Sequence, residues 1–111
     1  MTTVLSAAQI AMHEFAPKFG QLGEDVVFGD VWERPELSKR DRSLITVACL
    51  VSGYRVNELP YHLGRAVENG LTKEELIETI THLAFYAGWP CAVSAMSAAM
   101  KVFEADSPKQ P

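Results

Sequence analysis

The stretch from Asn57 to Gly70, which reads N-E-L-P-Y-H-L-G-R-A-V-E-N-G, predicts a short amphipathic helix that the rest of the chain can bury. Asn57 can cap the first turn, Pro60 is tolerated there because those N–H groups have no intrahelical partner, and Gly70 can form the left-handed turn that ends a helix. Glu58 and His62 stand four residues apart and therefore share a face. An apolar stripe runs at helical spacing: Leu59, Leu63, Ala66 and Val67. The sequence thus predicts a carboxylate and an imidazole beside an apolar wall.

Two shorter helices are predicted before this stretch. Ser6 and Gln9 have the spacing of a capping box, and the helix they open would reach Phe15 before a proline interrupts it. A second amphipathic helix would end near Gly29, followed by an irregular link that Trp32 anchors. Its apolar positions are spaced three and four residues apart: Phe19, Leu22 and Val26.

Three longer helices complete the prediction. Ser38 and Asp41 give a capping signal for a central helix whose segment 44–51 is apolar almost all round, so we expect it to be buried. Thr72 and Glu75 form a further capping box, and Gly88-Trp89-Pro90 separates that helix from the last one. The first of these two helices is expected to face the core with Leu76, Ile80, Leu83 and Ala87. The last helix is rich in small residues that permit close helix approach, namely Ala92, Ser94, Ala95, Ser97, Ala98 and Ala99. Its larger residues form a series spaced three and four apart that can pack against neighbouring helices: Val93, Met96, Met100 and Phe103. No stretch alternates with period two over the length of a strand, so the fold is predicted to be all-α, with six helices, two of them short.

Composition narrows the class of protein. The 111 residues suit a single domain over residues 1–106 with a disordered, proline-containing tail over 107–111, and a hydrophobic content of 48% favours oligomerisation. The net charge is −4 without a basic run, so no nucleic-acid partner is expected. We expect a cytoplasmic protein with no membrane partner, because neither a signal peptide nor a spanning segment is recognisable. Cys49 and Cys91 form no CxxC pair and are expected to be reduced and buried.

Chemistry can first be sought from the residues alone. Glu58, His62 and nearby Arg55 could line a small polar site. Alternatively, Glu58 and Arg55 form a solvated ion pair and His62 is a structural helix histidine. Spacing alone favours this second interpretation, because structural networks also collect such residues.

Four motifs change that balance. They are F-G-D-V-W (28–32), L-S-K-R-D-R-S-L-I-T (37–46), E-L-P-Y-H-L-G-R-A-V-E-N-G-L-T (58–72) and H-L-A-F-Y-A-G-W-P (82–90). In this order and spacing the chain resembles the carboxymuconolactone decarboxylase family over about residues 15–103. The resemblance implies an all-helical fold assembled as a ring-shaped homotrimer or homohexamer, with active sites near subunit contacts.

The same motifs distinguish two branches of the family. The alkylhydroperoxidase-D-like branch has a CxxC pair ahead of its histidine, and those two positions are Arg55 and Glu58 here. The glutamate that this branch has nineteen residues before the histidine is Ser43 here. Without the nucleophilic and resolving thiols, and with Cys49 and Cys91 elsewhere, peroxidase activity is not expected. The chain resembles the decarboxylase branch instead.

That resemblance implies a reaction and a set of roles. The family's decarboxylases remove CO2 from 4-carboxymuconolactone to give 3-oxoadipate enol-lactone, with no metal or organic cofactor. His62 would deliver the proton, and Glu58 would orient it and raise its pKa. Arg42 and Arg55 are candidates for binding the carboxylates of the substrate, because a guanidinium fork matches a carboxylate; Arg42 could instead form an ion pair with a neighbouring acid such as Asp41.

The fourth motif supplies candidates for the pocket wall: His82, Tyr86 and Trp89. A structural packing role is favoured for Trp89, whereas a pocket role and a structural role are equally weighted for Tyr86 and His82. Three functions follow: a cofactor-free decarboxylase of an unsaturated carboxy-lactone, a thiol-dependent peroxidase or redox protein, or a non-catalytic oligomeric binding module. The first is preferred.

Overall fold

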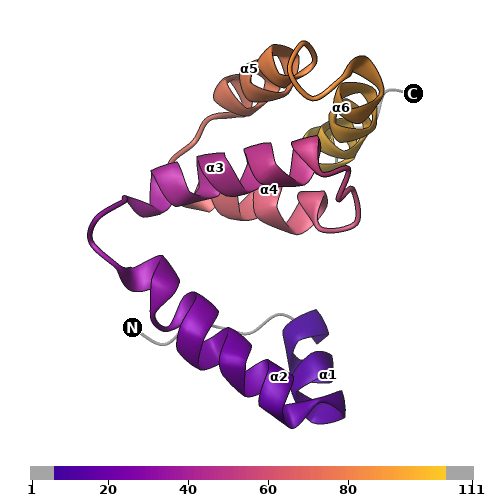
Figure 1. Cartoon of the computed structure of the whole chain (residues 1–111). Coiled ribbons are helices and arrows are strands. Elements are labelled where there is room, and N and C mark those ends of the chain that lie inside the picture. The colour runs from indigo at the N-terminus through magenta and orange to yellow at the C-terminus, as the bar shows by residue number, and fades with distance from the viewer. Residues whose placement is uncertain (1–6, 105–111) are drawn as a thin grey trace. The chain divides into compact units, whose positions relative to one another are not determined.

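The computed structural model describes residues 7–104, and within that range the chain forms six α-helices and no strand, as the all-α prediction requires (Figure 1). Two units divide between Leu37 and Ser38. We call residues 7–37 the N-terminal arm and residues 38–104 the helical body. The predicted boundaries of a single domain over 1–106 stay a prediction, and the expected tail over 107–111, like the capping residue Ser6, lies outside the described residues.

The N-terminal arm contains α1 (Ala7–Phe15), α2 (Pro17–Leu22), a π-helical turn η1 (Gly23–Phe28) and a 3₁₀ turn η2 (Val31–Glu33). These follow the predicted pair of short helices and the irregular link. Gly20 lets the two helices approach closely, since a Cβ there would lie 2.5 Å from His13 Nδ1. His13 Nδ1 in turn lies 3.6 Å from a carboxylate oxygen of Glu24. Phe28 and Trp32 stack with ring centroids 6.2 Å apart.

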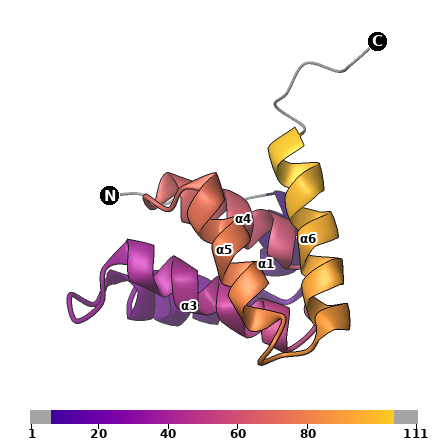
Figure 2. The same ribbon diagram turned by 90° about the horizontal axis from the view of Figure 1, so that it is seen from above.

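The helical body contains α3 (Lys39–Ser52), α4 (Leu59–Glu68), α5 (Lys73–Leu83) and α6 (Trp89–Glu104). α4 packs most extensively against α3 and α6, and Figure 2 shows α6 running beside α4 and α5. Asn69 Nδ2 donates to Ser43 Oγ at 2.9 Å, so the beginning of α3 lies beside the end of α4. The core is formed mainly by small and aliphatic side chains: Val47, Val51, Leu59, Leu63, Ala66, Leu71, Leu76, Ile80, Ala84, Ala92, Ala95 and Ala99.

The ends of α4 agree only in part with the prediction. Glu58, not Asn57, occupies the N-cap position, and its side chain makes no capping hydrogen bond. Proline is accommodated in the first turn as expected. At the other end Gly70 adopts a φ of 109°, its N–H donates to the carbonyl of Val67 (3.0 Å), and the N–H of Leu71 donates to the carbonyl of Ala66 (2.9 Å). These two bonds form a Schellman motif, which confirms the predicted glycine cap.

The other helix starts follow the predicted capping chemistry. Ser38 Oγ accepts from the N–H of Asp41 at 3.0 Å. At the start of α5, Thr72 Oγ1 accepts from the N–H of Glu75 (3.0 Å) while a Glu75 carboxylate oxygen accepts from the N–H of Thr72 (2.9 Å). Two orphan donors of the first turn are therefore satisfied reciprocally.

Several burial predictions were wrong in the single chain. The central helix α3 buries only one face, with Ile45 55% exposed and Cys49 also exposed rather than buried. The stripe on α4 is buried at three positions, but Val67 is 45% exposed. In α6 the buried residues are Ala92, Ala95 and Ala99, in agreement with the prediction that small residues allow close helix approach. The larger residues Val93 and Met100 lie about half exposed, whereas Met96 and Phe103 pack against the core edge. None of the described helices is long and apolar enough to span a membrane.

Candidate functional site

His62 is the fourth residue of α4. Its side chain lies between the buried Leu59 and Leu63 on one side and solvent on the other. The imidazole is half-buried, its Nδ1 atom is enclosed, and the ring of Tyr61 meets it edge-on with centroids 5.1 Å apart. The apolar spacing of α4 causes this position, since a residue adjacent to the stripe must lie at the edge of the core. His62 is thus a titratable group held at the boundary between core and solvent.

The pKa of His62 is lowered from its usual value near 6.5. Burial is the largest cause, because it disfavours the charged imidazolium, and the guanidinium of Arg65 adds to it. Glu58 acts in the opposite direction but is outweighed. Glu58 itself raises the pKa of His62, as expected, but the net pKa is lowered.

Glu58 is the N-cap residue of α4, four residues before His62, and Arg55 lies in the preceding turn. The N–H of Glu58 donates to the carbonyl of Arg55, and the N–H of His62 donates to the carbonyl of Glu58, each at 3.3 Å. These bonds place the three residues on consecutive turns. Arg55 and Glu58 are both exposed. The structure therefore places the predicted carboxylate one turn before the imidazole, and Glu58 acts on the pKa of His62. Arg55 lies in the turn before α4, and its side chain extends towards Gly53.

Arg42 lies elsewhere on the body. It belongs to the first turn of α3, beside Ser43, and Ser43 contacts Asn69 at the end of α4. His62 precedes Asn69 by seven residues, so it lies roughly 10 Å further along the α4 axis at 1.5 Å per residue. Within the body, Arg42 and His62 are therefore near opposite ends of α4.

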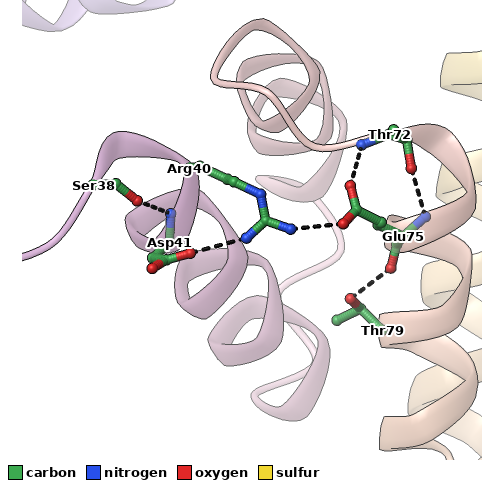
Figure 3. A network of polar contacts seen from close by, with 6 residues as sticks. All are labelled: Ser38, Arg40, Asp41, Thr72, Glu75 and Thr79. Atoms are coloured by element: carbon green, nitrogen blue, oxygen red, sulfur yellow. Dashed lines mark hydrogen bonds and ion pairs between the residues drawn. The ribbon is translucent and has the colours of Figure 1, made fainter.

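The ion pair of Asp41 involves Arg40, which the sequence analysis had not considered. A guanidinium nitrogen of Arg40 lies 3.0 Å from Asp41 Oδ1, and the other lies 2.6 Å from Glu75 Oε2 on α5 (Figure 3). The pKa of Glu75 is lowered, first by the backbone N–H of Thr72 and then by Arg40. No sequence signal could have indicated this contact, because its partners are 35 residues apart. Arg40 thus ties the start of α3 to the start of α5.

His82 lies beside an open hollow between α3 and α5, with a volume of about 490 Å³. Arg40 and Glu75 lie on its rim together with Glu78 and Thr79, and the remaining lining is apolar. Neither His62 nor Arg55 is among its lining residues. The body therefore places His82 in a different setting from the His62 end of α4.

Tyr86 and Trp89 lie near the turn between α5 and α6. Tyr86 stacks on His82 with centroids 4.8 Å apart, yet its side chain is 79% exposed. Trp89 begins α6 and is 65% exposed, so its ring does not pack into the core of the body as we had expected. Both rings are available for contacts beyond the single chain's core.

A second cation near His62 was also missed by the sequence analysis. Arg65 stands three residues after His62, and one of its guanidinium nitrogens lies 2.9 Å from Glu68 Oε2. The i, i+3 spacing was available as a signal, since such residues are neighbours on a helix surface. Among the described residues, no group of three or more His, Cys, Asp or Glu side chains is placed to hold a metal ion.

Comparison with known proteins decides the family. Residues 17–101 match the sequence profile of the carboxymuconolactone decarboxylase family. The chain belongs to this family. It is 40% identical over 93 residues to the 4-carboxymuconolactone decarboxylase of Acinetobacter baylyi, a match that covers 84% of this chain and 69% of that protein. It is 33% identical over 90 residues to the nitrosuccinic acid decarboxylase of Metarhizium robertsii, covering 78% of this chain and 63% of that protein.

This membership bears on the predictions made from the motifs. The family expected from the motifs is confirmed, and both relatives are decarboxylases by name, in agreement with the expected class of carboxy-lyase. The chain spans about two thirds of the length of either relative. The individual site residues stay predictions.

Proposed function

We propose that this member of the carboxymuconolactone decarboxylase family removes CO2 from 4-carboxymuconolactone or a related unsaturated carboxy-lactone without a cofactor, with His62 as the proton donor. The observation that carries the proposal is a half-buried imidazole on α4, one turn after Glu58, with Arg55 in the turn that precedes the helix. The 40% identity to a 4-carboxymuconolactone decarboxylase supports the substrate class.

The chemistry fits the residue types at this end of α4. When the bond between the carboxylate carbon and the ring breaks, CO2 leaves and the electron pair moves through the ring alkene into the lactone carbonyl. The resulting dienolate takes up one proton on carbon, which His62 delivers. A cation beside the developing oxyanion and an acid beside the carbon are the two requirements. We assign the first to Arg55, with Arg42 as a further candidate for binding a carboxylate, and the second to His62.

Because the pKa of His62 is lowered, the imidazole must gain a proton before it can act as the proton donor. In the free protein the imidazole is mostly neutral at pH 7, because burial and Arg65 both disfavour its charged form. A substrate with two carboxylates brings negative charge next to the ring and raises the pKa of His62 again. His62 thus takes up its proton as the substrate binds, and Glu58 orients the imidazole.

The second relative suggests how far the substrate class extends. Nitrosuccinic acid carries a nitro group, which can accept the electron pair of a departing carboxylate as a lactone carbonyl does through an alkene. We infer that the substrate of this chain is an organic acid with a second carboxylate and an electron-accepting group conjugated to the carbon that loses CO2. The carboxy-lactone is the preferred member of that class because the more similar relative acts on it.

Self-association is part of the proposal. We propose a homotrimer or homohexamer, in which exposed residues of the fourth motif, His82, Tyr86 and Trp89, are candidates for substrate contacts at or near a subunit boundary. Their exposure in the single chain supports such a role.

The direct test is an assay of purified protein with 4-carboxymuconolactone, in which the loss of ultraviolet absorbance of the lactone is followed. His62→Gln should lower kcat by roughly 10² to 10⁴, the range for a general acid. His13→Gln is the matched control, since His13 is a partly exposed histidine of the arm, and it should leave kcat unchanged. Turnover by His62→Gln at the wild-type rate would refute the assignment of the proton donor.

Two further measurements distinguish the alternatives. If thiols took part, the double variant Cys49→Ser with Cys91→Ser would lose activity, whereas the proposed reaction is independent of both cysteines. If protonated His62 is needed, kcat/KM should fall as the pH rises through the lowered pKa of the free protein, and kcat should fall only at higher pH. A kcat that instead rises with pH through this range would indicate a base and contradict the proposed role.

A further inference from the structure

The N-terminal arm has no core of its own. None of residues 7–37 is buried, although the segment forms four helical stretches and carries nine large apolar side chains that are at least 42% exposed. These side chains are Ile10, Met12, Phe15, Phe19, Leu22, Val26, Val27, Val31 and Leu37. A segment of this length cannot offset its loss of conformational entropy without burying apolar surface. Its helices therefore need a surface that covers them.

The exposed apolar area is large enough for a stable contact. From the exposed fractions, the nine side chains present roughly 900 Å² to solvent, against about 800 Å² that each partner buries in a standard protein interface. Phe15 is 92% exposed and Phe19 is 64% exposed, one turn apart on the two sides of the break between α1 and α2.

The distribution of charge indicates what the arm binds. Residues 1–37 contain two basic and six acidic side chains, hence −4, whereas residues 38–111 contain eight of each and are neutral. The whole net charge of the chain is thus on the arm. Two arms would repel each other, and a body with a neutral, mixed surface is the better partner.

The helical body offers apolar surface to match. It exposes Ile45, Phe85, Trp89, Val93 and Met100, each to at least 48%. The hollow between α3 and α5 adds an apolar concavity beside Ile45. A chain that carries both an apolar arm and an apolar body surface can bury both by exchange between identical copies, which closes under two-fold or cyclic symmetry.

We propose that the N-terminal arm packs on the helical body of a second copy of this chain, so that the subunits of the oligomer are held together by exchanged arms. The proposal rests on self-association and is independent of the decarboxylase chemistry. The segment that joins the subunits is the N-terminal arm.

The first test compares two double variants of the full-length chain by sedimentation velocity over a range of concentrations. Phe15→Ser with Phe19→Ser removes apolar surface from the arm, while Glu14→Ser with Lys18→Ser changes the neighbouring exposed residues and keeps the net charge. We expect the wild type and the control to be oligomers. The phenylalanine variant should dissociate towards the 12.2 kDa monomer, with a dissociation midpoint raised on the order of 100-fold. An oligomer unaffected by the loss of both phenylalanines would overturn the proposal.

The second test identifies the partner of the arm. Equal amounts of ¹⁴N- and ¹⁵N-labelled protein are mixed, allowed to exchange, and treated with a lysine cross-linker. Lys18 is the one lysine of residues 1–37, and Lys39, Lys73 and Lys101 lie on the described body. Mixed-isotope links from Lys18 to a body lysine support exchange. Links only within one isotope show that the arm covers its own body, and links only between two Lys18 residues show that arms pair; either result overturns the proposal.

Trypsin provides a measure of protection. The bond after Lys18 should be cut slowly in the wild-type oligomer and much faster in the phenylalanine variant, because its arm loses its cover. A wild-type protein that is monomeric at all concentrations contradicts the exchange, whether its arm is protected or cut.

Discussion

The cap that ends α4 gives the sharpest test of how this sequence specifies its fold. Gly70 has a φ of 109°, a backbone conformation that side-chain-bearing residues rarely adopt, and nothing lies within 4 Å of a Cβ built there. Gly70→Ala therefore meets no steric neighbour, and its whole cost is backbone strain. We expect a loss of about 1–2 kcal/mol in the free energy of unfolding.

Gly64 supplies a matched control on the same helix. It lies inside α4, and nothing lies within 4 Å of a Cβ built there either. Gly64→Ala adds the same methyl group to regular helical backbone, so it should raise the free energy of unfolding by about 0.5–1 kcal/mol. The identical chemical change is thus expected to have opposite signs at two positions six residues apart.

Urea unfolding followed by circular dichroism measures both effects. The protein concentration is kept fixed, because the stability of an oligomer depends on it. Gly70→Ala should lower the urea midpoint of unfolding by about 0.5–1 M, and Gly64→Ala should raise it, with the dependence of the free energy on urea unchanged in both. Equal shifts for the two variants, or no shift for Gly70→Ala, would refute the argument that the Schellman cap requires glycine.

Three further results are expected. Arg65→Gln should raise the pKa of His62, and Glu58→Gln should lower it further, as measured by NMR titration of the His62 ring. Arg65→Lys keeps the charge and should behave as the wild type. An unshifted titration in Arg65→Gln would show that the guanidinium does not act on the ring. Because the pKa of folded His62 lies below 6.5, its contribution to stability is complete above pH 6.5 and is lost as the pH falls through the folded value. Unfolding free energies should therefore fall below pH 6.5, and less so in His62→Gln; equal pH dependence in both proteins would rule this out. Thr72→Ala should cost about 1 kcal/mol because the N-cap is lost, and Glu74→Gln, in the same turn, should cost less; the reverse order would contradict the capping assignment.

Local signals were sufficient for most of the secondary structure. The capping box at Thr72 and Glu75, the Ser38 cap and the glycine at position 70 each act within four residues of the chain, so sequence spacing alone could locate them. The misassigned cap at Asn57 shows the limit of such reasoning. The turn between α3 and α4 makes the helix start one residue later than predicted. Glu58 is therefore the N-cap residue, although Asn57 is the residue type that caps better.

The candidate site was predictable to the same extent. Glu58 and His62 lie one turn apart at the start of α4, so their proximity follows from the helix itself, whereas Arg55 lies in the turn that precedes it. The net pKa of His62 did not follow, because it depends on the burial of α4 and on Arg65. Whether His62 lies close to Arg42 and His82 depends on how separate helices pack. The body places Arg42 near the far end of α4 and His82 beside the hollow between α3 and α5.

The sequence by itself determined the helices, most of their caps, the family and the spacing of Glu58 and His62 on one face of α4, because each depends on residues close together in the chain or on a pattern of motifs. Only the tertiary structure decided which helix faces are covered. It buries the alanines of α6 and leaves Val93, Met100, Ile45 and the whole apolar side of the arm exposed. The physical reason is that periodicity reports how apolar a helix face is, whereas burial depends on which surface packs against it, and an apolar face of a single chain can belong to a contact between copies.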